Sequence, residues 1–105
     1  MKFVFEITIK PNHTEEEFVQ AWQNGSEIIQ REPGAMGTRL HKCISAPGKL
    51  LAIASWQSKA LRDAAMKTLS SNEVTRKLIT KHELFGDIRV VGEFEEPTWI
   101  VDPPS

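Results

Sequence analysis

The stretch FVFEITIKPNHTEEEF, residues Phe3–Phe18, encodes a strand, a turn and the start of a helix in immediate succession. Phenylalanine or isoleucine occupies every second position of FVFEITI, which is typical of a strand with one buried face. Pro11 ends this strand. Thr14 and Glu17 have the spacing of a capping box, and three consecutive glutamates lie near the positive end of the helix dipole. A helix is therefore predicted to begin directly after Thr14.

The predicted helix runs to about Arg31, and Pro33-Gly34 stops it. Its apolar stripe is interrupted by Gly25. Glycine inside a helix costs about 1 kcal/mol relative to alanine. The helix is therefore expected either to bend at Gly25 or to have a neighbour packed closely against its backbone there.

Two strands follow this helix, at about Met36–Ile44 and Lys49–Trp56, and a turn at Ala46-Pro47-Gly48 joins them into a hairpin. The second strand reads LLAIASW and is apolar on both faces. This pattern predicts a central strand with both sides covered.

A second helical region begins near Ser58, pauses at Ser70-Ser71-Asn72 and ends by Gly86. The last strand is predicted at about Asp87–Glu95. Strict alternation would place Ile88, Val90, Gly92 and Phe94 on one face of this strand, and Arg89, Val91 and Glu93 on the other. The element order is therefore βαββαβ.

This order predicts an α+β protein of the ferredoxin-like type, with an antiparallel sheet and the helices on one face. The opposite sheet face, which includes Val4 and Val91, is left open and needs a cover. A second copy of the chain is the simplest cover, because a two-fold interface buries the same patch on both subunits. We therefore expect a homodimer whose sheets close into a dimeric α/β barrel. Residues 1–95 would form this domain, and the apolar tail 96–105 would lie across the partner or over the mouth of a cleft.

The composition limits the classes of partner. The 105 residues carry 13 basic and 14 acidic side chains, and the net charge of −1 favours neither nucleic acid nor a membrane surface. The strand LLAIASW lacks the aromatic residues with which RNA-recognition motifs of the same element order stack bases. No segment approaches the ~20 apolar residues of a membrane span. The single Cys43 cannot form an intramolecular disulfide, which fits a cytoplasmic protein, and no His/Cys cluster for a metal is present.

Two further stretches, EPGAMGTRLHK (residues 32–42) and WQSKALRDA (residues 56–64), complete a pattern with the opening segment. In their order and spacing the three stretches resemble the antibiotic biosynthesis monooxygenase family, over about residues 2–94. The resemblance implies a dimeric α/β barrel of two ferredoxin-like subunits. It also implies oxygenation of phenolic or polycyclic aromatic substrates without metal, flavin or nicotinamide, so no cofactor is expected. Such an enzyme needs a dry pocket, a group that takes the substrate's proton, and donors that hold the developing oxyanion.

Haem-degrading relatives in this family carry an asparagine in the first strand, a tryptophan in the second helix and a histidine further along. The corresponding positions here are Glu6 or Ile7, Ala65, and Thr75 or Arg76. Haem binding is therefore the least favoured function. Other members often have histidine at the position of Ala65, so that proton acceptor is missing as well.

The histidines are natural proton carriers, because their unperturbed pKa is near neutrality. His82 continues the four-residue spacing of Val74 and Leu78, which would direct it along an apolar helix face toward the cleft. Its alternative role is that of a helix-end residue that satisfies the last carbonyl groups. His41 shares a strand face with Arg39 and points either into the cleft or toward the partner. His82 and His41 are therefore the candidate catalytic proton acceptors.

Substrate binding is predicted from aromatic and charged side chains. Trp22, Phe18 and Met66 could form a wall against a flat aromatic molecule. Arg39 could hold a phenolate or carboxylate. The alternatives are that the apolar side chains belong to the core and that Arg39 lies at the surface.

These observations favour two functions from different classes. The first is a cofactor-independent monooxygenase, an oxidoreductase that acts on a small phenolic or quinol-type aromatic substrate. The second is a non-catalytic dimeric protein that binds a small apolar molecule and has lost its reactive groups, as Ala65 suggests.

Overall fold

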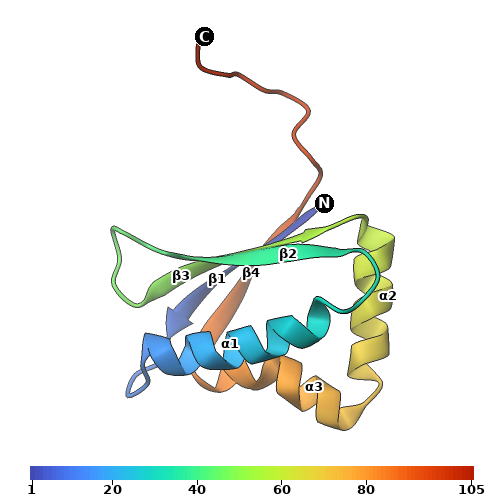
Figure 1. Ribbon diagram of the computed structural model, residues 1–105. Coiled ribbons are helices and arrows are strands. Elements are labelled where there is room, and N and C mark those ends of the chain that lie inside the picture. The colour runs from blue at the N-terminus through green and yellow to red at the C-terminus, as the bar shows by residue number, and fades with distance from the viewer.

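The computed structural model describes residues 1–105 and has the predicted order of elements. The strands are β1 (Lys2–Ile9), β2 (Ala35–Lys42), β3 (Lys49–Trp56) and β4 (Gly86–Phe94). The helices are α1 (Glu15–Ile29), α2 (Lys59–Ser70) and α3 (Glu73–Thr80), and a short 3-10 helix, η1 (Lys81–Leu84), follows α3. The strands lie in the order β2-β3-β1-β4, and each strand is antiparallel to its neighbours. The helices lie on one side of the sheet (Figure 1). The prediction of a ferredoxin-like α+β fold is confirmed.

Local hydrogen bonds determine where the helices start. The Thr14 hydroxyl accepts a hydrogen bond from the Glu17 amide at 3.2 Å, and the Glu17 carboxylate accepts one from the Thr14 amide at 3.0 Å. This capping box satisfies two amides at the start of α1 that would otherwise lack partners. Asn72 caps α3 by accepting from the Thr75 amide at 3.0 Å, which accounts for the break after α2.

Two element ends differ from the sequence-based expectation by two residues. The helix α1 ends at Ile29 instead of Arg31, because the amides of Arg31 and Glu32 bond three residues back and close a turn. The strand β2 ends at Lys42, and the side chain of Ile44 beyond it is fully exposed. No helix has both the length and the apolar composition that a membrane crossing requires.

Gly25 marks a close approach between α1 and α3. A Cβ atom at this position would lie 3.1 Å from the Cα atom of Ile79 and 3.1 Å from the carbonyl oxygen of Leu78. Of the two expectations for this glycine, the closely packed neighbour is therefore confirmed. The contact holds α3 against α1 and positions the segment that follows α3 over the sheet.

The core lies between the helices and the inner face of the sheet. Ile7, Phe18, Leu50 and Ala52 form a cluster of buried side chains. Their positions follow the predicted alternation of the strands, since the residue after each of Ile7, Leu50 and Ala52 points to the other face. The strand β3 lies between β2 and β1, so the prediction of a central strand is confirmed.

A β-bulge at Val91 changes the predicted alternation of β4. Val91 has no partner in β1, because the residues on either side of it pair with neighbouring residues of β1. One inserted residue moves every following side chain to the other face. The prediction that Gly92 and Phe94 share a face with Val90 is therefore wrong. Glu93 lies on the helix-covered side instead.

The sheet face away from the helices is apolar, and we call it the open face. Its partly exposed apolar side chains include Val4, Leu51, Ile53, Val91 and Phe94. The segment after β4 extends away from the body on the side of the sheet opposite the helices (Figure 1). Trp99 and Val101 in this tail are 91% and 99% exposed, so the tail does not pack over its own chain.

Candidate active site

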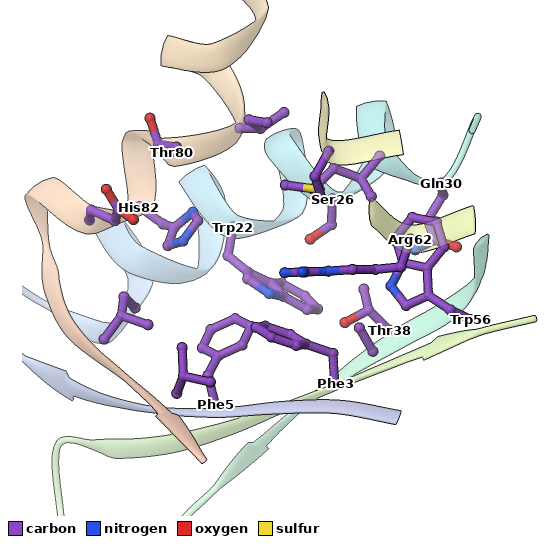
Figure 2. Close-up of a pocket in the computed structure, with 17 residues that line it drawn as sticks. Phe3, Phe5, Trp22, Ser26, Gln30, Thr38, Trp56, Arg62, Thr80 and His82 are labelled. Carbon is purple, nitrogen blue, oxygen red and sulfur yellow. The ribbon is translucent and has the colours of Figure 1, made fainter. Parts of the chain in front are cut away.

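A cavity of about 240 Å³ lies between the inner face of the sheet and the helices (Figure 2). Of its 17 lining residues, 10 are hydrophobic. All four strands, the three helices and η1 each contribute lining side chains. The cavity is therefore a product of the complete fold and not of any one segment.

His82 reaches this cavity from η1 and is the only histidine that lines it. Its ring stacks on Phe5, with 6.5 Å between the ring centroids, and meets the Phe18 ring edge-on at 5.5 Å. Its Nδ1 atom is buried and has no hydrogen-bond partner, so His82 does not serve the helix end in the way its alternative role required. A buried polar atom without a partner costs about 1–3 kcal/mol. His82 therefore brings an imidazole with one buried, unpaired nitrogen to the wall of the cavity.

His82 faces inward by a different route from the one expected. Val74 and Leu78 are 69% and 46% exposed, so the predicted apolar row does not face the core. Ile79 is buried instead. The chain tightens into a 3-10 helix after Thr80, and Ile79 near the end of α3 lies three residues before His82, a spacing that places side chains on neighbouring positions of a helical surface. His82, three residues after Ile79, therefore points inward with it.

Burial lowers the pKa of His82 below its usual value of 6.5, because the charged imidazolium loses hydration. The neighbouring Glu83 carboxylate acts in the opposite direction and raises this pKa by a smaller amount. The ring is therefore neutral at neutral pH. In the tautomer that carries its proton on Nε2, the Nδ1 atom can accept a proton, and Glu83 would stabilise the resulting charge.

Aromatic rings form a continuous surface along the cavity. Phe3 and Phe5 are neighbours on β1, with ring centroids 5.9 Å apart. Figure 2 shows the Trp22 indole above these rings, and Trp56 at the end of the cavity away from His82. Stacked and edge-on contacts with such rings favour a flat aromatic ligand.

Arg62, which the sequence did not single out, also lines the cavity. Its guanidinium carbon, Cζ, lies 4.2 Å from the centroid of the Phe3 ring in a cation–π contact. The side chain is only 22% exposed. Arg62 and Met66 are four residues apart on α2, and this spacing is the signal that could have placed both on the cavity side.

The structure brings together some of the residues proposed from the sequence. Trp22, Met66 and His82 all line the cavity. Phe18 does not, because it is fully buried in the core, where it meets the ring of His82 edge-on. Its alternative assignment as a core residue is therefore the one found.

Arg39 and His41 lie outside the cavity. They pair with Ile53 and Leu51 of β3, and all four side chains project from the open face. Thr38 has the opposite orientation and lines the cavity. The alternation along β2 was predictable, but which face turns toward the helices depends on how the sheet packs. The proposed site roles of Arg39 and His41 therefore find no support in this cavity.

Comparisons with known proteins agree with the fold. Residues 1–76 match a family model described as antibiotic biosynthesis monooxygenase. No curated protein sequence matches the chain.

Similar solved structures have low sequence identity to this chain. A variant of SnoaB, a cofactor-independent oxygenase from Streptomyces nogalater, has a TM-score of 0.78 at 17% identity, over 96% of each chain. A putative antibiotic biosynthesis monooxygenase from Bordetella bronchiseptica has a TM-score of 0.63 at 17% identity, over 90% of this chain and 96% of the other. Another from Nitrosomonas europaea has a TM-score of 0.60 at 16% identity, over 90% of this chain and 100% of the other. At these identities the likeness shows a shared fold.

Proposed function

The chain belongs to the antibiotic biosynthesis monooxygenase family, and on this premise we propose that it is a cofactor-independent monooxygenase of a small phenolic or quinol-type aromatic molecule. The reaction takes place in the cavity between the sheet and the helices. One observation carries the proposal. His82 lines a largely apolar cavity with a ring that burial keeps neutral, and its buried Nδ1 atom has no hydrogen-bond partner.

Such a reaction begins with the loss of a proton. Dioxygen in its triplet ground state reacts slowly with closed-shell molecules, so the substrate must first become electron-rich. A phenol becomes electron-rich when its proton passes to the imidazole of His82, and the phenolate can then transfer one electron to dioxygen. The two radicals combine at the ring carbon para to the phenolic oxygen. Loss of water from the resulting hydroperoxide leaves a carbonyl group on that carbon.

This sequence of steps needs no external reductant. One oxygen atom enters the product, and the other leaves as water with two hydrogens that the substrate gives up. The aromatic lining of Phe5 and Trp22 would hold the substrate ring and exclude water from the radical pair. The Glu83 carboxylate would stabilise the imidazolium that forms on His82.

Oxygen uptake tests the proposal. Metal-free protein is expected to consume dioxygen in the presence of naphthols whose para carbon carries a hydrogen. α-Naphthol is informative, because its para carbon can become a carbonyl and yield a naphthoquinone and water. With heavy-isotope dioxygen, one labelled atom is expected in the quinone. Label found only in hydrogen peroxide or water would exclude a monooxygenase reaction.

A pair of variants tests the role of His82. His82→Gln is expected to lower turnover about a hundredfold or more, because groups that transfer protons contribute about 10²–10⁴ to the rate. His41→Gln is the matched control, since His41 lies on the open face and should leave turnover unchanged. Full turnover in His82→Gln would refute the assignment. A ligand that raises the melting temperature but is recovered unchanged would favour a binding protein over an enzyme.

We also propose that a second copy of the chain covers the open face. Apolar patches of this kind are unfavourable in water, and a two-fold contact would bury the same patch on both subunits. The tail leaves the body on the side of the open face (Figure 1). Its exposed side chains Trp99, Ile100 and Val101 would then pack on the partner.

A further inference from the structure

Four planar groups follow one another along one wall of the cavity. The Cζ atom of Arg62 lies 4.2 Å from the centroid of Phe3, whose centroid lies 5.9 Å from that of Phe5. The Phe5 centroid lies 6.5 Å from that of His82. The guanidinium and the imidazole are therefore separated by two phenyl rings. Figure 2 shows the Arg62 side chain reaching toward the Trp22 indole from the side opposite His82.

The guanidinium of Arg62 has donors without partners. Only its Nη1 atom forms ion pairs, at 3.4 Å from Oδ1 of Asp63 and 3.7 Å from Oε1 of Glu93. Its Nε and Nη2 atoms have no hydrogen-bond or ion-pair partner. These two nitrogens form one edge of the guanidinium, and their parallel N–H groups match the two oxygens of a carboxylate.

Neutral donors lie at the same end of the cavity. The side-chain oxygen of Gln30 accepts a hydrogen bond from the Gly37 amide at 2.7 Å, which leaves the Gln30 amide NH₂ as a donor. The Ser26 hydroxyl lines the cavity near Arg62 in Figure 2, whereas the nearby Thr38 hydroxyl donates its hydrogen to the Ile53 carbonyl oxygen at 3.4 Å.

Charge distinguishes the two ends of the cavity. Glu83 is the only carboxylate that lines it, and Glu83 is adjacent to His82 in the chain. Arg62 is the only cationic side chain that lines the cavity, and Asp63 and Glu93 pair only with its Nη1 atom. A negative group on a ligand is therefore disfavoured beside Glu83 and best placed at Arg62. A phenolic hydroxyl, which must give up its proton, fits beside His82.

We infer that the cavity takes an aromatic carboxylate, with the carboxylate on the Nε/Nη2 edge of Arg62 and the phenolic group at His82. The inference rests on the proposed function for the orientation of the phenol, while the carboxylate site stands on Arg62 and its neighbours. The spacing of two rings between the polar ends favours a bicyclic aromatic skeleton over a single ring.

Binding of redox-inert ligands tests this inference without any turnover. Naphthoate and naphthamide share one skeleton and differ in charge, and tryptophan fluorescence or calorimetry would measure their affinities. The protein is expected to bind naphthoate at least about tenfold more tightly than naphthamide, because a hydrogen-bonded charge contributes more than a neutral hydrogen bond. Arg62→Met should abolish this preference, and Arg62→Lys should keep part of it. Arg76→Met, on the exposed surface of α3, is the matched control and should keep it fully.

Each outcome bears on the inference. Equal affinity for the two ligands in the unaltered protein, or no binding of either, would overturn the carboxylate site even if Arg62→Met failed to fold. A preference that survives in Arg62→Met would overturn it as well. Oxygen uptake with uncharged α-naphthol is measured separately. The monooxygenase proposal can therefore stand when the carboxylate site fails, and the carboxylate site can stand when no oxygen is consumed.

Discussion

Glu93 lies opposite Phe3 in the pairing of β4 with β1, on the helix-covered side of the sheet. The bulge at Val91 is the reason, because it reverses the side-chain alternation for the rest of β4. The reversal brings the Glu93 carboxylate within 3.0 Å of Lys59 Nζ and 3.7 Å of Arg62 Nη1. The extra residue in the edge strand β4 thus places Glu93 as a counter-ion of Arg62, a cationic side chain that lines the cavity.

Glu93→Gln should strengthen binding of an aromatic carboxylate. Glu93 competes with the ligand for the guanidinium of Arg62, and removal of its charge also removes a repulsion. We expect naphthoate affinity to rise severalfold while the free energy of unfolding falls by only about 0–1 kcal/mol, since the ion pairs are partly solvated. Glu73 pairs with Lys77, which is far more exposed than Arg62. Glu73→Gln should therefore change neither the naphthoate affinity nor the free energy of unfolding. An unchanged or weaker naphthoate affinity in Glu93→Gln would argue against direct binding at Arg62.

His82→Phe should stabilise the protein and inactivate it. Phenylalanine can keep the contacts with Phe5 and Phe18 and removes the buried nitrogen that has no partner. We expect the free energy of unfolding in urea to rise by about 1–3 kcal/mol, while oxygen uptake with α-naphthol is lost. A clear loss of stability would instead mean that His82 has a structural role in the folded chain.

The stability of the unaltered protein should fall as the pH drops below 6.5. The pKa of His82 is lowered in the folded state and has its usual value of 6.5 in the unfolded chain. Between these two values the unfolded chain binds a proton that the folded chain does not, so the free energy of unfolding decreases toward lower pH. The contribution of His82 to the free energy of unfolding is complete above pH 6.5 and is lost as the pH falls through the folded-state pKa of His82. The stability difference between His82→Phe and the unaltered protein should therefore widen over that window, and a constant difference would contradict the assignment.

Gly25→Ala should destabilise the fold although alanine favours helices. The added Cβ atom would meet backbone atoms of Leu78 and Ile79 at 3.1 Å, and backbone cannot move aside as a flexible side chain can. We expect a loss of about 1–3 kcal/mol in urea unfolding. Gln23→Ala, at an exposed position of the same helix, should stay within about 0.5 kcal/mol of the unaltered protein. A stabilising Gly25→Ala would show that α3 does not pack against this backbone.

Ile53→Glu should prevent the proposed pairing of two chains. Ile53 lies on the open face between β1 and β2, and a carboxylate buried there without a partner would be costly. Sedimentation at micromolar concentration is expected to show a dimer for the unaltered chain and a monomer for the variant. Ala60→Glu, on the exposed surface of α2, should remain dimeric. A monomeric unaltered chain would rule out the proposed interface. If the unaltered chain is a dimer, removal of residues 96–105 would measure what the tail contributes to dimer affinity.

The helices and strands could be predicted from the amino-acid sequence, because their signals are local. Alternation defines β1, the capping box of Thr14 and Glu17 starts α1, and these features depend on residues only a few positions apart. The same holds for the break at Asn72 between α2 and α3. From these elements alone the order βαββαβ and the ferredoxin-like fold followed.

The tertiary structure decided which side chains share the cavity. Arg62 meets Phe3 and His82 meets Phe5 only when segments far apart in the chain pack together. The bulge at Val91 and the tightening of the chain at η1 arise from strand pairing and helix packing, which no local pattern encodes. For the same reason the sequence could not exclude His41 as a site residue beside His82, because only the packed sheet has an inner and an outer face.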